Sequence, residues 1–201
     1  ANVPRICFIN KLDRTGASFE RSYQSILDRL SKKAVRVQLP IGLEDNFEGV
    51  VDLLRMKAYY FEGEMGNQVI EKEIPENMKA DAGKYHNELI EKIVEQDDVL
   101  MTEYLDGKIP DDATLKSLLR KGVIANEIFP VFAGSALKNK GVQLVLDAVV
   151  DYLPAPTDIP PIEGVDPNTD QPVVRHASDS EPFSALAFKV ATDPFVGQLI
   201  F

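Results

Sequence analysis

V-P-R-I-C-F-I-N-K-L-D-R, residues 3–14, joins an apolar run to a polar end. The run at residues 6–9 is unbroken, which predicts a strand buried on both faces, as in a parallel sheet. Asn10, Lys11 and Asp13 follow the run directly. Ligands of open α/β sheets bind outside the carboxyl ends of the strands, so we expect these three side chains to line a binding site.

The pattern Asn-Lys-x-Asp suits a guanine base. An ionised carboxylate such as Asp13 accepts two parallel hydrogen bonds, and guanine offers two adjacent donors, N1–H and the N2 amino group. Adenine lacks this pair, and a site that leaves a buried polar group unpaired can reject it by ~10⁴-fold or more. Asn10 can serve the N7 and O6 side of the base or tie neighbouring loops together, and the stem of Lys11 can lie along the base. The alternative interpretation is a solvated polar turn.

A second apolar run, residues 128–133, leads into G-S-A-L-K at residues 134–138. Gly134 allows a close approach of the backbone, and the N–H groups of Ser135 and Ala136 can then donate to guanine O6. Donors at that position reject adenine, whose 6-amino group is itself a donor. Alone, Ser-Ala-Leu is an ordinary strand-to-helix turn, but after Asn-Lys-x-Asp it predicts the second half of a guanine pocket.

Residues 10–13 followed by residues 134–137 resemble the fourth and fifth guanine-recognition motifs of translational GTPases. The long separation is similar to that in elongation factor G, which carries an extra subdomain between these motifs, whereas elongation factor Tu has none. The similarity extends over nearly the whole chain, at Gly42, Phe47, 49–53, 57–58, 138–143, 147–149, 151–154, 175–179, 181–189 and 192–197.

The resemblance implies an α/β fold: the C-terminal half of a P-loop GTPase domain with an inserted α+β subdomain, then the start of a β-barrel domain. The expected divisions are 1–33 (GTPase part), 34–126 (insert), 127–158 (GTPase end), 159–180 (linker) and 181–201 (barrel start). The residues implied to bind GTP or GDP are Asn10, Lys11, Asp13, Ser135, Ala136 and Leu137. The implied activity is that of a ribosomal translocase, which couples GTP hydrolysis to movement of tRNA and mRNA in elongation.

The sequence contains no G-x-x-x-x-G-K-[S/T] phosphate loop. We therefore expect a fragment that carries the base-binding half of the site, is inactive by itself and contains no catalytic residue. Mg²⁺ is implied for the parent protein, with its ligands outside this chain. His86 and His176 are far apart and lack neighbouring ligand spacing, so they predict no metal site.

The charge and hydrophobic content of the chain exclude some classes of partner. The net charge of −10 and the pI of about 4.7 argue against binding nucleic acid through a basic face. Hydrophobic residues make up 44% of the chain, enough for a core, and no apolar stretch approaches the ~20 residues of a membrane span. Cys7 is the only cysteine and is expected to be a small core residue. We expect a cytoplasmic monomer, with an organellar matrix as the other possible location.

The resemblance implies the ribosome as partner, through the large-subunit stalk and the factor-binding site, with tRNA and mRNA involved indirectly. Docking of the inserted subdomain on the stalk would require Lys79, Lys84 and Lys92 to cluster on one face. The alternative interpretation is that the charged helix faces of the insert are simply solvated. Two other interpretations remain open. One is a ribosome-recycling, ribosomal-protection or termination relative, and the other is a non-hydrolysing interaction module with a nucleotide-like fold.

Periodicity predicts the remaining elements. We expect helices over 19–32, from Pro75, over 99–105, over 113–121 with Gly122 ending it, and over 142–153. We expect strands over 35–41, within 49–61 and over 68–74, forming a small antiparallel sheet, and over 186–190 as a barrel strand. The proline-rich segment 154–161 is expected to be a stiff linker, followed by a polar loop over 165–180.

Overall fold

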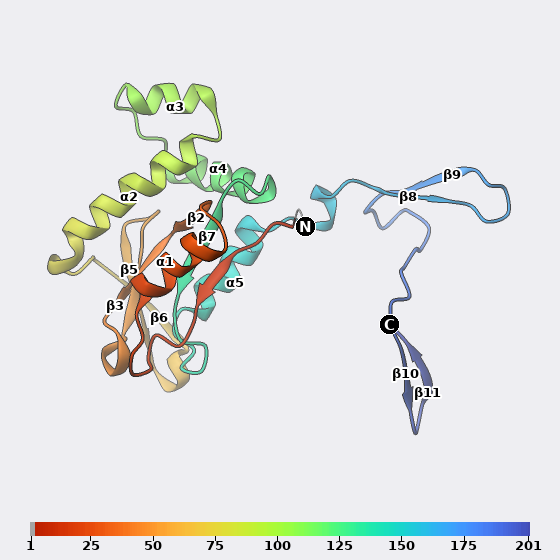
Figure 1. The fold of residues 1–201 in the computed structure, drawn as a ribbon, viewed down its shortest axis with the longest axis horizontal. Coiled ribbons are helices and arrows are strands. Elements are labelled where there is room, and N and C mark those ends of the chain that lie inside the picture. The colour runs from red at the N-terminus through yellow and green to blue at the C-terminus, as the bar shows by residue number, and fades with distance from the viewer. Residues whose placement is uncertain (1–2) are drawn as a thin grey trace. The chain divides into compact units, whose positions relative to one another are not determined.

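The computed structural model describes residues 3–201, which form two compact units that divide between Leu153 and Pro154. The first unit contains a three-stranded parallel sheet in the order β1 (Cys7–Ile9), β7 (Phe129–Ala133), β2 (Ala34–Arg36) (Figure 1). Helix α1 (Phe19–Arg29) connects β1 to β2, and its N-cap Ser18 accepts a hydrogen bond from the Arg21 N–H. The parallel sheet expected around the first apolar run is therefore present.

Burial in this sheet depends on the position of each strand. All five residues of the central strand β7 are buried. In β1 only Ile9 is buried, although we expected the whole strand to be covered on both faces. The prediction was wrong here because β1 lies at one edge of the sheet that residues 3–201 form.

Helices cover both faces of the parallel sheet. Val131 and Ala133 pack in one hydrophobic cluster with α1, whereas Phe132 packs in a second cluster with α5 (Val142–Tyr152). Successive side chains of a strand point to opposite faces, so α1 and α5 lie on opposite sides of β7. This helix–sheet–helix arrangement is a mixed α/β layer structure.

An antiparallel sheet lies between β2 and β7 in the sequence. Its strands pair in chain order: β3 (Gln38–Ile41), β4 (Gly49–Asp52), β5 (Lys57–Glu62) and β6 (Gln68–Lys72). Short 3₁₀ turns, η1 (Glu44–Asn46), η2 (Glu64–Gly66) and η3 (Glu76–Met78), lie between or after these strands. Three helices follow, namely α2 (Lys79–Val94), α3 (Asp98–Leu105) and α4 (Asp112–Ile124), with α3 furthest from the strands in Figure 1.

Two details of this region differ from the sequence prediction. The single strand expected over 35–41 is divided at Val37, and Ala34–Arg36, which we assigned to the insert, pairs with β7 instead. Helix α4 also continues through Gly122, which we expected to end it. A Cβ at Gly122 would lie 2.8 Å from Ile128 Cδ1, so the glycine permits close packing rather than a helix end.

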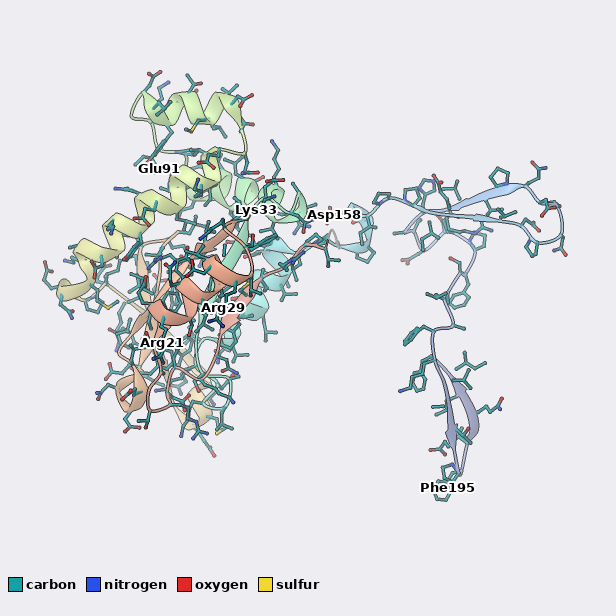
Figure 2. The ribbon with its side chains drawn as sticks, viewed as in Figure 1. Arg21, Arg29, Lys33, Glu91, Asp158 and Phe195 are labelled. Carbon is teal, nitrogen blue, oxygen red and sulfur yellow. The ribbon has the colours of Figure 1, made fainter. Side chains whose placement is uncertain are left out.

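Unit Pro154–Phe201 begins with the proline-rich segment, which includes the 3₁₀ turn η4 (Pro156–Asp158). Two hairpins follow: β8 (Ile162–Val165) with β9 (Pro172–Arg175), and β10 (Val190–Asp193) with β11 (Gly197–Ile200). The first hairpin occupies part of the expected polar loop. In the second, the strand begins only at Val190, later than predicted, and Phe195 lies at its tip (Figure 2).

Gln38 joins the two sheets of the first unit. Its side chain is 1% exposed, and its Oε1 accepts a hydrogen bond of 3.0 Å from the Ala133 N–H. Val37 N–H also donates to Val131 O at 3.1 Å, so β3 continues directly from the strand that pairs with β7. The end of β7 is therefore attached to the antiparallel sheet through a buried polar contact. None of the helices within residues 3–201 has the length and apolar character to cross a membrane.

We expect Gln38→Met to lower the free energy of unfolding by about 1–3 kcal/mol, because the buried Ala133 N–H would lose its acceptor while the side-chain length is kept. Urea unfolding followed by circular dichroism measures the change. Gln68→Met is the matched control, since Gln68 is exposed on β6. An equal unfolding free energy in Gln38→Met and the unaltered chain would contradict this role of the buried amide.

Candidate functional site

The loops that follow β1 and β7 lie side by side. The register of the two parallel strands places Ile9 opposite Ala133, so both strands end at the same edge. Gly134 N–H donates to Ile9 O at 3.1 Å, and Leu12 N–H donates to Gly134 O at 3.2 Å. Leu12 is 1% exposed and anchors the first loop in the core. The structure thus brings together the two motifs that are far apart in the sequence.

Asn10 ties the two loops together. Its Oδ1 accepts hydrogen bonds from the Ala136 N–H at 2.9 Å and from the Lys11 N–H at 2.7 Å. Of the two roles considered for Asn10, loop bridging is the one that the described geometry contains. Lys11 is exposed and has a left-handed backbone (φ 64°), which turns the chain from the strand end back towards Leu12.

Asp13 and Ser135 form the polar centre of the site. Asp13 Oδ1 and Ser135 Oγ are both buried, and neither atom has a hydrogen-bond partner within residues 3–201. The Ser135 side chain lowers the pKa of Asp13, aided by the charges of Arg14 and Lys138, although the two side chains do not meet in ordinary hydrogen-bond geometry. A lowered pKa keeps the carboxylate ionised at neutral pH, and its acceptor capacity is lost only as the pH falls through that lowered value.

The loop after β7 is closed on itself. Ser135 N–H donates to Lys140 O at 2.9 Å, and Lys140 N–H donates to Ser135 O at 3.0 Å. A Cβ on Gly134 would lie 2.4 Å from Lys140 O and 2.7 Å from the Phe8 ring, so only glycine fits there. The N–H groups of Ser135 and Ala136, which we expected to face a base, already donate to acceptors within the chain. The N–H groups of Leu137 and Lys138 make no such bond among the described residues.

A cavity of about 390 Å³ opens beside Asp13. Asp13 lines it together with Leu137 and Lys138 from the second loop. Glu44, Asp45 and Phe47, from the connection between β3 and β4, form another part of the wall. The sequence analysis did not find these three, because nothing in their local pattern shows that an antiparallel connection reaches the end of β1.

Another cavity, of about 380 Å³, lies between β4, α4 and α5. Its buried carboxylate, Asp52, already accepts the Leu54 and Arg55 N–H groups at 2.8 and 3.0 Å. Burial raises the pKa of that carboxyl group, and the two backbone hydrogen bonds oppose the shift. The cavity beside Asp13 is the better candidate, because Asp13, which lines it, has a buried carboxylate oxygen without a partner among the described residues.

Residues 3–201 contain no group of three or more His, Cys, Asp or Glu side chains placed to hold a metal ion. His86 Nδ1 lies 2.6 Å from Leu53 O and connects α2 to the antiparallel sheet. Cys7 is half-buried, and burial raises the pKa of its thiol. Neither side chain contributes to the cavity beside Asp13.

Comparison with known proteins gave a family match and a structural match. The family model described as the elongation factor Tu GTP binding domain matches residues 1–155. Among solved structures, a crystal structure of a Thermus thermophilus protein is similar over 98% of this chain, with a TM-score of 0.75 and 25% sequence identity. This chain spans only 26% of the length of that protein chain.

We expect Asn10→Ala to speed hydrogen exchange of the Ala136 amide about tenfold, because the amide loses its only described acceptor. Exchange measured by NMR reports this amide individually. Asn10→Asp retains an acceptor oxygen and should keep the protection, and Asn67→Ala, at an exposed turn position, is the control. Unchanged Ala136 exchange in Asn10→Ala would show that the side chain does not hold the loops together.

Proposed function

Because the chain belongs to the family of the elongation factor Tu GTP binding domain, we propose that its two joined loops bind the guanine base of GTP and GDP. The observation that carries this proposal is that Asp13 lines the cavity between the two loops while its buried Oδ1 has no hydrogen-bond partner among the described residues. A buried carboxylate oxygen without a partner is unfavourable, and two parallel N–H donors would satisfy the carboxylate. Guanine presents such a pair at N1 and N2.

The neighbouring groups support the same assignment. The lowered pKa of Asp13 keeps the carboxylate in the form that only accepts hydrogen bonds. Lys11 is exposed just after the carboxyl end of β1, where its aliphatic stem can cover one face of a flat base. Asn10 holds the second loop against the first, so that Asp13 and the second loop face the same base.

Guanine O6 needs a donor from the second loop. The Ser135 and Ala136 N–H groups are engaged with Lys140 and Asn10. The Leu137 and Lys138 N–H groups remain, and both residues line the cavity. We therefore assign the O6 donors to Leu137 and Lys138, while Ser135 and Ala136 shape the loop. A donor at this place discriminates against the 6-amino group of adenine.

Phosphate binding is assigned outside these residues, since the sequence contains no G-x-x-x-x-G-K-[S/T] motif. The chain then supplies affinity and selectivity for the base, while GTP hydrolysis and its Mg²⁺ belong to other parts of a working GTPase. The phosphate groups of the bound nucleotide are the groups that react in hydrolysis. The residues described above orient the base and exclude other purines.

At the level of the cell, the proposed function is that of a translational GTPase similar to elongation factor G, acting on the ribosome in the cytoplasm. The segment between the two motifs, which contains an antiparallel sheet and three helices, favours this branch over elongation factor Tu. A ribosome-recycling or ribosomal-protection relative is the alternative within the same class. A non-hydrolysing interaction module is the alternative from another class, and GTP hydrolysis by the full-length protein would exclude it.

The basic face that stalk docking requires is not supported. Lys79, Lys84 and Lys92 each lie within 4 Å of an acidic side chain on the same helical segment: Glu76 at 2.6 Å, Glu88 at 3.9 Å and Glu95 at 2.7 Å. These pairs reduce the positive charge available to an acidic partner. Contact with the ribosome therefore remains a proposal from the family, without a specific surface on α2.

Replacing the acceptor tests base recognition directly. We expect Asp13→Asn to weaken GTP binding in the full-length protein roughly a hundredfold or more, since two charge-assisted bonds are lost. Binding of XTP should improve, because xanthine carries a carbonyl in place of the N2 amino group. Calorimetric titration with both nucleotides measures the change, and Asp106→Asn, on an exposed turn, is the control. Retained preference for GTP in Asp13→Asn would refute the role of Asp13.

Most affinity for a nucleotide comes from its phosphates. We therefore expect the 201-residue chain by itself to bind GDP more weakly than micromolar. Isothermal calorimetry with GDP measures this affinity. Micromolar or tighter binding would mean that the base pocket alone suffices, or that phosphate contacts exist within residues 1–201.

A further inference from the structure

The connection between β3 and β4, residues 42–48, belongs to the antiparallel sheet but is bonded to the loop that carries Asp13. Glu44 N–H donates to Leu12 O at 2.8 Å, and Glu44 Oε1 accepts a hydrogen bond of 2.7 Å from the Gly16 N–H. Leu12 precedes Asp13 and Gly16 follows it closely. One residue of the inserted sheet thus holds both sides of the segment that presents the carboxylate.

Gly16 is also held from α1. Arg21, labelled on α1 in Figure 2, donates through Nη2 to Gly16 O at 2.6 Å. Gly16 therefore has its N–H bonded to Glu44 and its carbonyl bonded to Arg21. With Leu12 buried in the core, the path of residues 12–16 is defined at both ends. Asp13 lies inside this path, so its position depends on the anchors.

The same connection reaches the loop after β7. Lys140 Nζ donates to Phe47 O at 2.7 Å, and Phe47 is 2% exposed. Glu44 and Phe47 both line the cavity beside Asp13. The 42–48 connection is consequently bonded to both loops of the proposed base site.

The backbone of this connection is unusual in a way that serves these contacts. Glu44 has a left-handed backbone (φ 56°), which residues other than glycine rarely adopt. Gly42 is also left-handed (φ 72°), and a Cβ there would lie 1.8 Å from Asn46 O. A left-handed backbone at a residue such as glutamate costs free energy, so it is found where the contacts of that residue offset the cost. Here those contacts are the two bonds to residues 12 and 16.

We propose that Glu44 is a positioning residue for guanine recognition: its two hydrogen bonds hold residues 12–16 so that Asp13 meets both N–H donors of the base. This inference rests on the proposed function of the site. Two parallel bonds to a flat base tolerate little displacement, so a site of this kind needs support from surrounding groups. Glu44 supplies that support from the inserted sheet and acts through Asp13.

Comparison of GDP with inosine diphosphate (IDP) tests the proposal, because IDP lacks the N2 amino group and can make only one of the two bonds to Asp13. In the full-length protein, the unaltered chain should bind GDP about tenfold more tightly than IDP. In Glu44→Ala this ratio should fall to near one, with most of the loss in GDP binding. Competition against a fluorescent guanine nucleotide at neutral pH gives both affinities.

Three further variants separate the causes. Glu44→Gln keeps an oxygen that can accept the Gly16 N–H, so this variant should keep the GDP/IDP affinity ratio of the unaltered protein. If Glu44→Gln loses the ratio, the charge of Glu44 and not its hydrogen bond is responsible, and the proposal is overturned. Glu44→Gly removes the carboxylate but adopts the left-handed backbone freely, so it carries the test if Glu44→Ala does not fold. Glu48→Ala removes an exposed carboxylate from the same connection and is the matched control.

The outcomes distinguish this proposal from the function on which it rests. If Glu44→Ala and Glu44→Gly bind GDP and IDP with equal losses, Glu44 has a structural role only, and the positioning role is wrong while guanine recognition stands. If the unaltered protein binds ADP as tightly as GDP, the proposed function fails and the role of Glu44 fails with it. A reduced GDP/IDP ratio in both variants, with the ratio retained in Glu44→Gln and Glu48→Ala, supports the proposal.

Discussion

The parallel pairing of β1 with β7 is the contact on which the rest of the candidate site depends. It places Ile9 opposite Ala133, so two polar loops that are distant in the sequence begin at the same edge of one sheet. The pairing continues past the strand ends, because Gly134 N–H donates to Ile9 O and Leu12 N–H donates to Gly134 O. Without this register, Asn10 would not reach the Ala136 amide, and Asp13 would not face the second loop.

The segment between β2 and β7 packs against the parallel sheet through shared hydrophobic clusters. Phe132 of β7 shares a hydrophobic cluster with residues of β3, β4, α2 and α4. The opposite cluster joins Val131 and Ala133 to Val50 and Tyr59 of the antiparallel sheet. Gln38 adds a buried hydrogen bond to the end of β7. Because the two sheets share their core, the connection between β3 and β4 is held close enough to contact the loops that follow β1 and β7.

Sequence reasoning succeeded where the signal is local. An unbroken apolar run predicted the strand β1, and helical periodicity predicted α1, α2 and α5. It failed where tertiary position decides the outcome. Burial of β1 depends on which strands lie beside it, and Gly122 stays helical because Ile128 packs against it. Local pattern also does not show which amides are already paired: the Ser135 amide donates to Lys140 O within the same loop, and the Ala136 amide donates to Asn10 Oδ1.

The available chemistry can be seen in the order of the residues alone: an aspartate shortly after an asparagine, a second loop that begins with glycine, and no phosphate-loop motif. These depend on residue type and short spacing, which a sequence contains directly. Which groups are already paired depends on the folded arrangement, which leaves Asp13 Oδ1 without a partner among residues 3–201 and brings Glu44 to the loop that carries Asp13. The reason is that hydrogen-bond partners are chosen by proximity in space, and here the partners come from strands, turns and helices that the sequence separates.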